Sequence, residues 1–280
     1  MKVILLGTGT PNAEPDRSGP SVAITHRGES WVVDCGPGVV RRASAAARAG
    51  NPELEPRNLR KLLLTHLHSD HTAGLADIML TPWVLGRNAP LRITGPEGTA
   101  SMASLLTEAY SADIRERLEG LEPANHEGCK TEVEEISGEG TLSTGEVRIS
   151  CFRTNHGGLP SWGYRFESEE GAVVVSGDTA PFQGMTKAYE GCQVLVHEVY
   201  SSTGFMNREE EWKRYHSSVH TSADELARIA SQVRPKLLVL YHQLLHGVDE
   251  ETLMKEIKRT YSGEVVYGKD LQTFSAREIR

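Results

Sequence analysis

The sequence has no long apolar run and few cysteines. No stretch of about 18 consecutive apolar residues occurs, so no membrane-spanning helix is predicted. The four cysteines, at positions 35, 129, 151 and 192, form no C-x-x-C pair, which argues against a disulfide framework and favours reduced packing residues. The first residues lead directly into a strand-like segment without a secretory cleavage site, so we expect a cytoplasmic protein.

Positive charge is also scarce. The chain has 30 Lys and Arg against 38 Asp and Glu, a formal net charge of −8, and no basic run. Proteins that bind nucleic acid neutralise phosphates with Lys and Arg. A nucleic-acid partner is therefore disfavoured, although a local basic patch would still permit one, and a small-molecule substrate is expected.

What the sequence does contain is the pattern of a globular protein with alternating strands and helices. Its hydrophobic content of 38% and charged content of 24% suit one large domain or two ordinary ones, and no linker-like stretch divides it. Alternation and turn residues predict strands at 3–6, 21–26, 30–34, 62–64, 91–94, 147–154, 163–167, 172–176, 194–197, 237–240, 264–267 and 273–275, and helices at 38–49, 73–80, 99–110, 181–189, 222–232 and 250–260. The charged stretch 112–143 is the hardest to assign, and we expect it to hold a variable helix or a lid near the site mouth. Periodicity alone predicts a layered α/β protein.

One short segment holds most of the predicted chemistry. The apolar run 62–64 is followed by His66, His68, Asp70 and His71. Imidazole nitrogens and carboxylate oxygens are ligands that zinc prefers. From an extended strand end, His66 and His68 can turn toward one point, while Asp70 and His71 can reach a second point nearby. Because ligands in open sheets gather at strand ends, we predict a metal site here, and pairs of metals roughly 3.5–4 Å apart are a known device for hydrolysis.

Three further strand-like runs each end in a potential ligand. His156 follows the run to residue 154 and precedes two glycines, Asp178 follows the run 172–176, and His242 follows the run 237–241. Each residue alone would more often be a capping or hydrogen-bonded side chain. Three separate strands ending this way favour a site with more than one metal.

The segment His66-Leu67-His68-Ser69-Asp70-His71 resembles the H-x-H-x-D-H signature of the metallo-β-lactamase-fold hydrolases. The stretches 1–11, 33–38, 176–179 and 241–243 resemble the ribonuclease Z-like and arylsulfatase-like branch of that family, so the resemblance extends to about residue 274. It implies a single domain over 1–280 with the four-layer αββα sandwich of the metallo-β-lactamase fold. This fold hosts many chemistries, so the resemblance says little about the substrate.

The resemblance also implies the role of each ligand. The first metal is expected on His66, His68 and His156, the second on Asp70, His71 and His242, and Asp178 is expected to bridge the two, with Asp70 also counted among the catalytic residues. In the best-known β-lactamase subclass a cysteine stands at the position of Asp178, which argues against a dedicated β-lactamase. Redox di-iron relatives have glutamate at the position of His68. Two zinc ions, with manganese or iron as alternatives, fit best.

Three more residues are expected to support the ligands. His220 and Glu198 resemble the histidine–glutamate pair of ribonuclease Z-like enzymes, in which the histidine helps to protonate the leaving group. The alternative is that His220 is only a neighbour of a helix cap and Glu198 a surface acid. Asp34 is a candidate for a buried acid that orients a metal-bound histidine.

The other polar and aromatic candidates are predicted to be structural. This applies to the histidines at 26, 126, 197, 216 and 246, of which His246 could line the pocket, and to the aromatic residues at 83, 162, 182 and 205, of which Trp162 could form a pocket wall. The acidic run 209–211 is most simply a solvated face.

The expected function is metal-dependent hydrolysis by a metal-bridging hydroxide, on a phosphorus, sulfur or carbonyl centre. The long arm with which ribonuclease Z proper grips tRNA is inserted between the positions matching His156 and Asp178, which here are only 22 residues apart, 178 − 156. We therefore expect a phosphodiesterase acting on small or cyclic phosphodiesters. The alternatives are an arylsulfatase-like or lactonase/β-lactam-hydrolysing enzyme, a ribonuclease Z-type tRNA 3′ endonuclease, and a non-catalytic protein that binds a ligand through its metal pocket. A homodimer is possible by resemblance alone.

Overall fold

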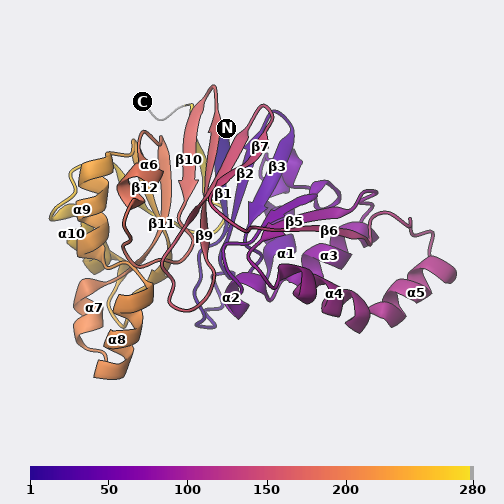
Figure 1. The fold of residues 1–280 in the computed structure, drawn as a ribbon, viewed down its shortest axis with the longest axis horizontal. Helices are drawn as coiled ribbons and strands as arrows, with labels where there is room; N and C mark the ends of the chain where they lie inside the picture. The colour runs from indigo at the N-terminus through magenta and orange to yellow at the C-terminus, as the bar shows by residue number, and fades with distance from the viewer. Residues whose placement is uncertain (278–280) are drawn as a thin grey trace.

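Two mixed β-sheets pack face to face in the computed structural model, which describes residues 1–277 (Figure 1). The first sheet has the strand order β14 (Thr273–Ser275), β1 (Lys2–Gly7), β2 (Ser21–His26), β3 (Glu29–Val33), β4 (Lys61–Leu63), β5 (Leu91–Gly95) and β6 (Thr131–Glu135). The second has the order β13 (Val265–Tyr267), β12 (Leu237–Leu244), β11 (Val194–Tyr200), β10 (Gly171–Val175), β9 (Trp162–Ser168), β8 (Arg148–Arg153) and β7 (Gly140–Thr144).

Helices cover the outer faces of both sheets, with α1, α3 and α4 at one side of the view and α9 and α10 at the other (Figure 1). The helices are α1 (Val39–Arg48), α2 (Ser69–Thr72), α3 (Leu75–Val84), α4 (Thr99–Ala109), α5 (Ser111–Glu119), α6 (Met185–Tyr189), α7 (Ser202–Met206), α8 (Glu210–Val219), α9 (Ala223–Val233) and α10 (Glu250–Lys258), with short 3-10 turns at Pro52–Leu54 and Pro56–Asn58. The arrangement is the predicted four-layer αββα sandwich.

Alternating side chains explain why the layers form. In β1, Val3 and Leu5 face the apolar core between the two sheets, whereas Ile4 and Leu6 face a second core under α1 and α3. A third core lies between the second sheet and α6, α9 and α10. Strands buried on both faces read as continuous apolar runs, which is why the sequence pattern located them well.

The parallel strands bring their C-terminal ends to one edge of the molecule. Strands β3, β4, β5 and β6 run parallel to one another, and so do β10, β11, β12 and β13. Loops that follow β4 and β10 therefore open on the same side as the end of β12, where ligands collect in open sheets.

The turns that the sequence predicted are present. Strands β2 and β3 pair as the expected hairpin, and Arg27 and Gly28 in its turn have φ angles of 46° and 85°. Positive φ at both central residues is the geometry of a tight two-residue hairpin turn. Helix α9 begins after Ser222, which forms a capping box with Glu225.

Two local predictions were wrong in part or in full. The stretch 112–143 does hold a helix, most of α5, together with the edge strands β6 and β7, but it is no lid, because none of its residues line the cavity beside His68, Asp70 and His220. Instead, helix α8, which no pattern had predicted, contributes to its lining. Trp162 is no pocket wall either, because it is 3% exposed in the core between the sheets.

Among residues 1–277, no helix combines the length and the apolar character needed to cross a membrane. All four cysteines are free thiols, as expected of packing residues. The single-domain organisation over 1–280 stays a prediction, and its last three residues lie outside the described part of the chain.

A buried guanidinium joins the first helical layer to its neighbours. Arg87 is 0% exposed and donates hydrogen bonds to the backbone carbonyls of Leu59, Ile78, Met79 and Gly128. Burial lowers its pKa to about 10. One side chain thus holds together the middle of α3, the loop before β4 and the loop before β6.

Replacing Arg87 with Met should therefore destabilise the fold. Arg87→Met leaves buried carbonyl groups without donors, so we expect a loss of at least about 3 kcal/mol in the free energy of unfolding. The measurement is urea unfolding followed by circular dichroism. Arg60→Met, at a neighbouring exposed position, is the control and should change the free energy by less than about 0.5 kcal/mol; equal effects of the two changes would contradict the structural role of Arg87.

Candidate metal centre

All seven predicted ligands lie together at the shared edge of the two sheets. His66, His68, Asp70 and His71 follow β4, His156 follows β8, Asp178 follows β10, and His242 lies within β12. Their donor atoms form overlapping groups, among them His66/His68/His156, His66/His71/Asp178 and Asp70/His71/His242, in each of which the atoms are within 4.8 Å of one another. These groups come from four separate strands, so only the folded chain assembles them.

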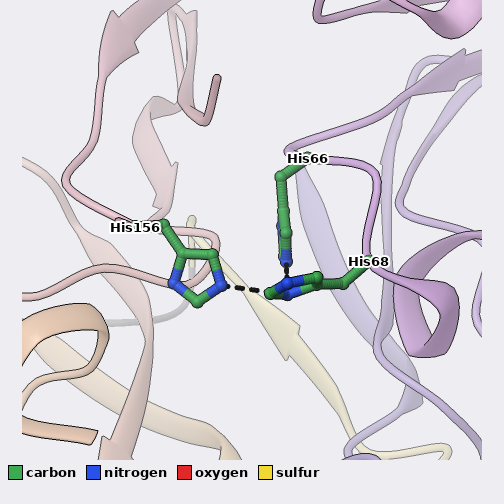
Figure 2. Close-up of side chains that lie close together, drawn as sticks. All are labelled: His66, His68 and His156. Carbon is green, nitrogen blue, oxygen red and sulfur yellow. Dashed lines mark hydrogen bonds between the residues drawn. The ribbon is translucent and has the colours of Figure 1, made fainter. Parts of the chain in front are cut away.

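Three imidazole nitrogens converge in the first group. His66 Nε2 and His156 Nε2 each lie 3.0 Å from His68 Nδ1 (Figure 2). An imidazole nitrogen carries either one proton or one lone pair, so His68 Nδ1 can complete only one of these contacts as a hydrogen bond. Three ring nitrogens that face one point are instead suited to donate lone pairs to a cation.

Burial keeps these rings neutral. It holds the pKa of His66 well below its usual value and lowers the pKa of His156 to about 4. His156 Nδ1 donates to the carbonyl oxygen of Val219 at 2.8 Å, which leaves the lone pair on Nε2. Neutral imidazole is the form that binds metals.

The second group mixes imidazoles with carboxylates. His71 Nε2 and His242 Nε2 lie 3.5 and 3.3 Å from Asp70 Oδ2, and both lie 3.4 Å from Asp178 Oδ2. His71 Nε2 and Asp178 Oδ1 are buried without a hydrogen-bond partner in the described part of the chain. Buried polar atoms are normally paired, so this donor set fits a divalent cation.

The electrostatics of the group point the same way. Burial would raise the pKa of Asp178, but His242 and His71 outweigh it and hold that pKa well below its usual value. Burial would lower the pKa of His71, but Asp178 and Asp34 outweigh it and raise that pKa well above its usual value. Within residues 1–277, Asp70 and Asp178 form ion pairs with histidines alone. The site therefore stabilises added positive charge, which bound metal would supply.

Asp34 is buried as predicted, and the histidine that it contacts is His71. Asp34 Oδ2 lies 2.8 Å from His71 Nδ1, and the carboxylate also accepts hydrogen bonds from the Thr65 amide and hydroxyl at 2.7 and 2.8 Å. A carboxylate only accepts, so Nδ1 of His71 carries the proton and Nε2 is free to ligate.

Glu198 and His220 also lie together. Glu198 is fully buried in β11, where its Oε1 accepts hydrogen bonds from the Thr221 and Thr179 amides at 2.9 and 3.2 Å and lies 3.4 Å from His220 Nδ1. Burial lowers the pKa of His220 to about 4, and burial followed by Asp178 raises the pKa of Glu198 well above its usual value. The alternative of a surface acid is wrong for Glu198, since it is 0% exposed.

An irregularity in the second sheet positions His242. Glu198 pairs with Tyr241 and Val199 with Gln243, so His242 is an extra residue on β12 with a φ angle of 44°. Such a bulge re-aims a side chain next to a site. The sequence placed this ligand just after a strand, whereas β12 continues through it to Leu244.

A cavity of about 1140 Å³ opens above the cluster. His68, Asp70, Asp178, His220 and His242 form part of its lining, and the loop after β1, the segment after β12 and the region of α8 supply the rest. The cavity is also lined by Arg208, Glu211, Trp212 and Tyr215, which no pattern predicted, and by His216, which was predicted to be structural. The available signal was the i, i+3, i+4 and i+7 spacing of Trp212, Tyr215, His216 and Val219, which marks one helix face.

Comparison with known proteins agrees with this architecture. Residues 30–243 match the model of the family described as "Beta-lactamase superfamily domain". The chain is 33% identical over 281 residues to a protein from Mycobacterium bovis named Ribonuclease Z, covering 97% of this chain and 96% of that protein.

Solved structures of the same fold are more distant in sequence. The metallo-β-lactamase fold protein YhfI from Bacillus subtilis superposes with a TM-score of 0.73 at 20% identity, covering 98% of both chains. The short form of human tRNase Z superposes with a TM-score of 0.71 at 21% identity, covering 99% of both chains. Together with the buried histidine and aspartate cluster, these matches establish that the chain belongs to the beta-lactamase superfamily as a ribonuclease Z-like, metal-dependent hydrolase of the metallo-β-lactamase fold.

Proposed function

We propose that the chain is a phosphodiesterase that uses two divalent metal ions. His66, His68 and His156 would hold the first ion and Asp70, His71 and His242 the second, with Asp178 shared between them. The convergence of these donors, with His71 Nε2 and Asp178 Oδ1 left unpartnered within residues 1–277, is the observation that carries the proposal. Zinc suits the mixture of imidazole and carboxylate ligands, and manganese or iron would also accept it.

Bound metal ions would lower the pKa of a coordinated water to about 7 and polarise the scissile phosphoryl group. The chain's own residues orient this chemistry. Asp34 keeps the His71 proton on Nδ1, and the Val219 carbonyl keeps the His156 proton on Nδ1, so that both rings present Nε2. His220 borders both the cavity and Asp178, and Glu198 at 3.4 Å from its Nδ1 would hold it in place to protonate the leaving oxygen.

Small or cyclic phosphodiesters are the proposed substrates. Between His156 and Asp178 the chain forms only β9 and β10, which are joined at Glu169 and Glu170, so this segment contains no arm that could grip a long RNA. Besides the ligand carboxylates, the cavity lining includes Glu14 and Glu211 against one arginine, Arg208. These negative charges disfavour a polyanion that would extend beyond the metals.

A tRNA 3′ endonuclease is the second candidate. It is favoured by the full-length match to a relative named Ribonuclease Z, which weighs against the expectation of a small ester substrate. RNA is therefore retained as a possible partner. The arylsulfatase-like alternative acts on sulfur and the lactonase or β-lactam-hydrolysing alternative on a carbonyl carbon, whereas both candidates act on phosphorus. One assay panel therefore distinguishes these functions.

The metal proposal predicts the effect of Asp178→Asn, which keeps the side-chain volume but removes the charge. Elemental analysis of the wild type should give about two metals per chain, and the variant should lose at least one. Replacing a residue that only supports the metal ligands typically lowers metal affinity or activity about 10- to 100-fold. Replacing a ligand itself should therefore lower kcat/KM at least about a hundredfold. Asp113→Asn, an exposed position on α5, is the control; a folded wild type without stoichiometric metal would sink the proposal.

The proton-transfer role predicts that the effect of His220→Ala depends on the leaving group. With bis(p-nitrophenyl) phosphate the leaving group is a weak base that departs unprotonated, so kcat should change little. With an alkyl leaving group kcat should fall about 10²- to 10⁴-fold. Glu198→Gln should show the same dependence, more weakly. Equal losses on both substrates at unchanged metal content would assign the pair a purely structural role.

The substrate proposal predicts an order of activity across a panel. A nucleoside 2′,3′-cyclic phosphate and bis(p-nitrophenyl) phosphate should be cleaved faster than p-nitrophenyl sulfate, a lactone and nitrocefin. A tRNA precursor with a 3′ trailer completes the panel, with kcat/KM as the measurement. Preference for the tRNA precursor would establish the second candidate, and preference for the sulfate or the lactone would exclude both phosphodiester functions.

A further inference from the structure

Helix α8 turns one face toward the cavity. Trp212, Tyr215 and His216 line the cavity, and Val219, one turn further on, accepts the hydrogen bond from His156 Nδ1. Lys213 and Glu210 form an ion pair elsewhere on the helix. The predicted metal ligand His156 is thus hydrogen-bonded to the last turn of α8. This bond helps to fix which face of the helix is turned toward the metal site.

The aromatic rings of this face form a packed group. Trp212 stacks on His216 with ring centroids 5.7 Å apart and an interplanar angle of 24°. The Arg208 guanidinium lies 5.3 Å from the Trp212 ring centroid, and Tyr215 meets Trp212 edge-on at 6.0 Å. Even so, Trp212 and Tyr215 remain 47% and 42% exposed. Two large rings are thus held in place beside the site while much of their surface stays open.

Unpaired polar atoms lie next to these rings. His216 is 7% exposed, yet its Nδ1 has no hydrogen-bond partner among residues 1–277, and the same is true of the buried Arg208 Nε and His246 Nε2. The His216 and His246 rings are 4.6 Å apart at their centroids. Buried nitrogens without partners are costly, and Arg208, His216 and His246 all belong to the cavity lining, so a small shift of these side chains toward a bound polar group would give their nitrogens partners.

These observations define what the cavity can accept. A flat ring can stack on an aromatic face, and its polar edge can pair with the histidine and arginine nitrogens. A plain aryl group would leave those nitrogens unpaired and would fill little of a cavity of about 1140 Å³. A nucleoside satisfies both the stacking surface and the polar atoms.

The geometry points to a base-binding subsite on α8, in which Trp212 and Tyr215 stack on the nucleobase of a phosphodiester whose phosphate lies over the metal ligands. This inference rests on the proposed phosphodiesterase function and names the group that the enzyme selects. Trp212 and Tyr215 are specificity-determining residues, distant from the bond that breaks.

Two substrates with the same leaving group test the subsite. Thymidine 5′-(p-nitrophenyl) phosphate and methyl p-nitrophenyl phosphate are both monoanionic diesters that release p-nitrophenolate, and only the first carries a base. In Trp212→Leu and Tyr215→Leu, kcat/KM for the thymidine ester should fall about 10- to 100-fold, because stacking on a base is worth about 1–3 kcal/mol. The value for the methyl ester should change less than about threefold.

Two further variants separate recognition from folding. Trp212→Phe keeps a ring and should retain most of the preference for the thymidine ester. Tyr110→Leu removes an equally exposed tyrosine, 43% exposed, that does not line the cavity, and should change neither value. Equal losses on both esters would overturn the inference, since they would mean either that α8 only supports the fold or that its rings hold the p-nitrophenyl group.

Fluorescence gives a readout that does not need turnover. Trp31, Trp83 and Trp162 are at most 9% exposed, so Trp212 is the tryptophan that a ligand in the cavity can reach. Thymidine 5′-monophosphate should quench tryptophan emission of the metal-loaded wild type, and the quenching should be lost in Trp212→Leu. Quenching without hydrolysis of either ester would support the subsite and overturn the proposed phosphodiesterase function. Hydrolysis of both esters at equal rates without quenching would support the phosphodiesterase function and overturn the subsite.

Discussion

The buried carboxylates of Asp34 and Asp178, with the partly buried Asp70, create the constraint on which the site depends. They lie in the region where the two sheets meet, and His71 contacts all three. Buried negative charge is strongly destabilising unless it is paired. The raised pKa of His71, caused by Asp178 and Asp34 against the opposing effect of burial, shows how strongly this region favours positive charge. A bound metal ion would supply positive charge to these carboxylates and would thereby stabilise the fold.

A few hydrogen bonds connect this charged centre to the walls of the cavity. Glu198 accepts from the amides of Thr179 and Thr221, and so joins the loop that carries Asp178 to the start of α9. The Val219 carbonyl joins α8 to His156. Glu256 on α10 accepts from the amides of Ser202 and Thr203 at the start of α7. The floor and the α8 wall of the cavity are therefore parts of one bonded structure, so the ring surface that recognises a substrate keeps its place relative to the ligands.

Local sequence signals worked where one interaction dominates. The apolar runs of β4, β10 and β12 predicted buried strands because both faces of each are covered, and the helix predicted at 222–232 is α9, whose first residue follows the capping box of Ser222 and Glu225. The same reasoning missed α8. The acidic run 209–211 is exposed, as predicted, but Trp212, Tyr215 and His216 line a cavity whose opposite wall is supplied by distant loops, and no local pattern reveals that wall.

By itself, the sequence determined the types of candidate ligand, the strands that carry them and the layered class of the fold, because these depend on residue chemistry and on local periodicity. Only the tertiary structure decided how the ligands group, that Asp34 serves His71, and that a bulge opposite Glu198 and Val199 turns His242 toward Asp178. Each of these depends on the register of strands far apart in the chain, which no local pattern encodes. The placement of Trp212 and Tyr215 in one cavity with the candidate ligands is of the same kind, and the end of α8 is hydrogen-bonded to a histidine 63 residues away.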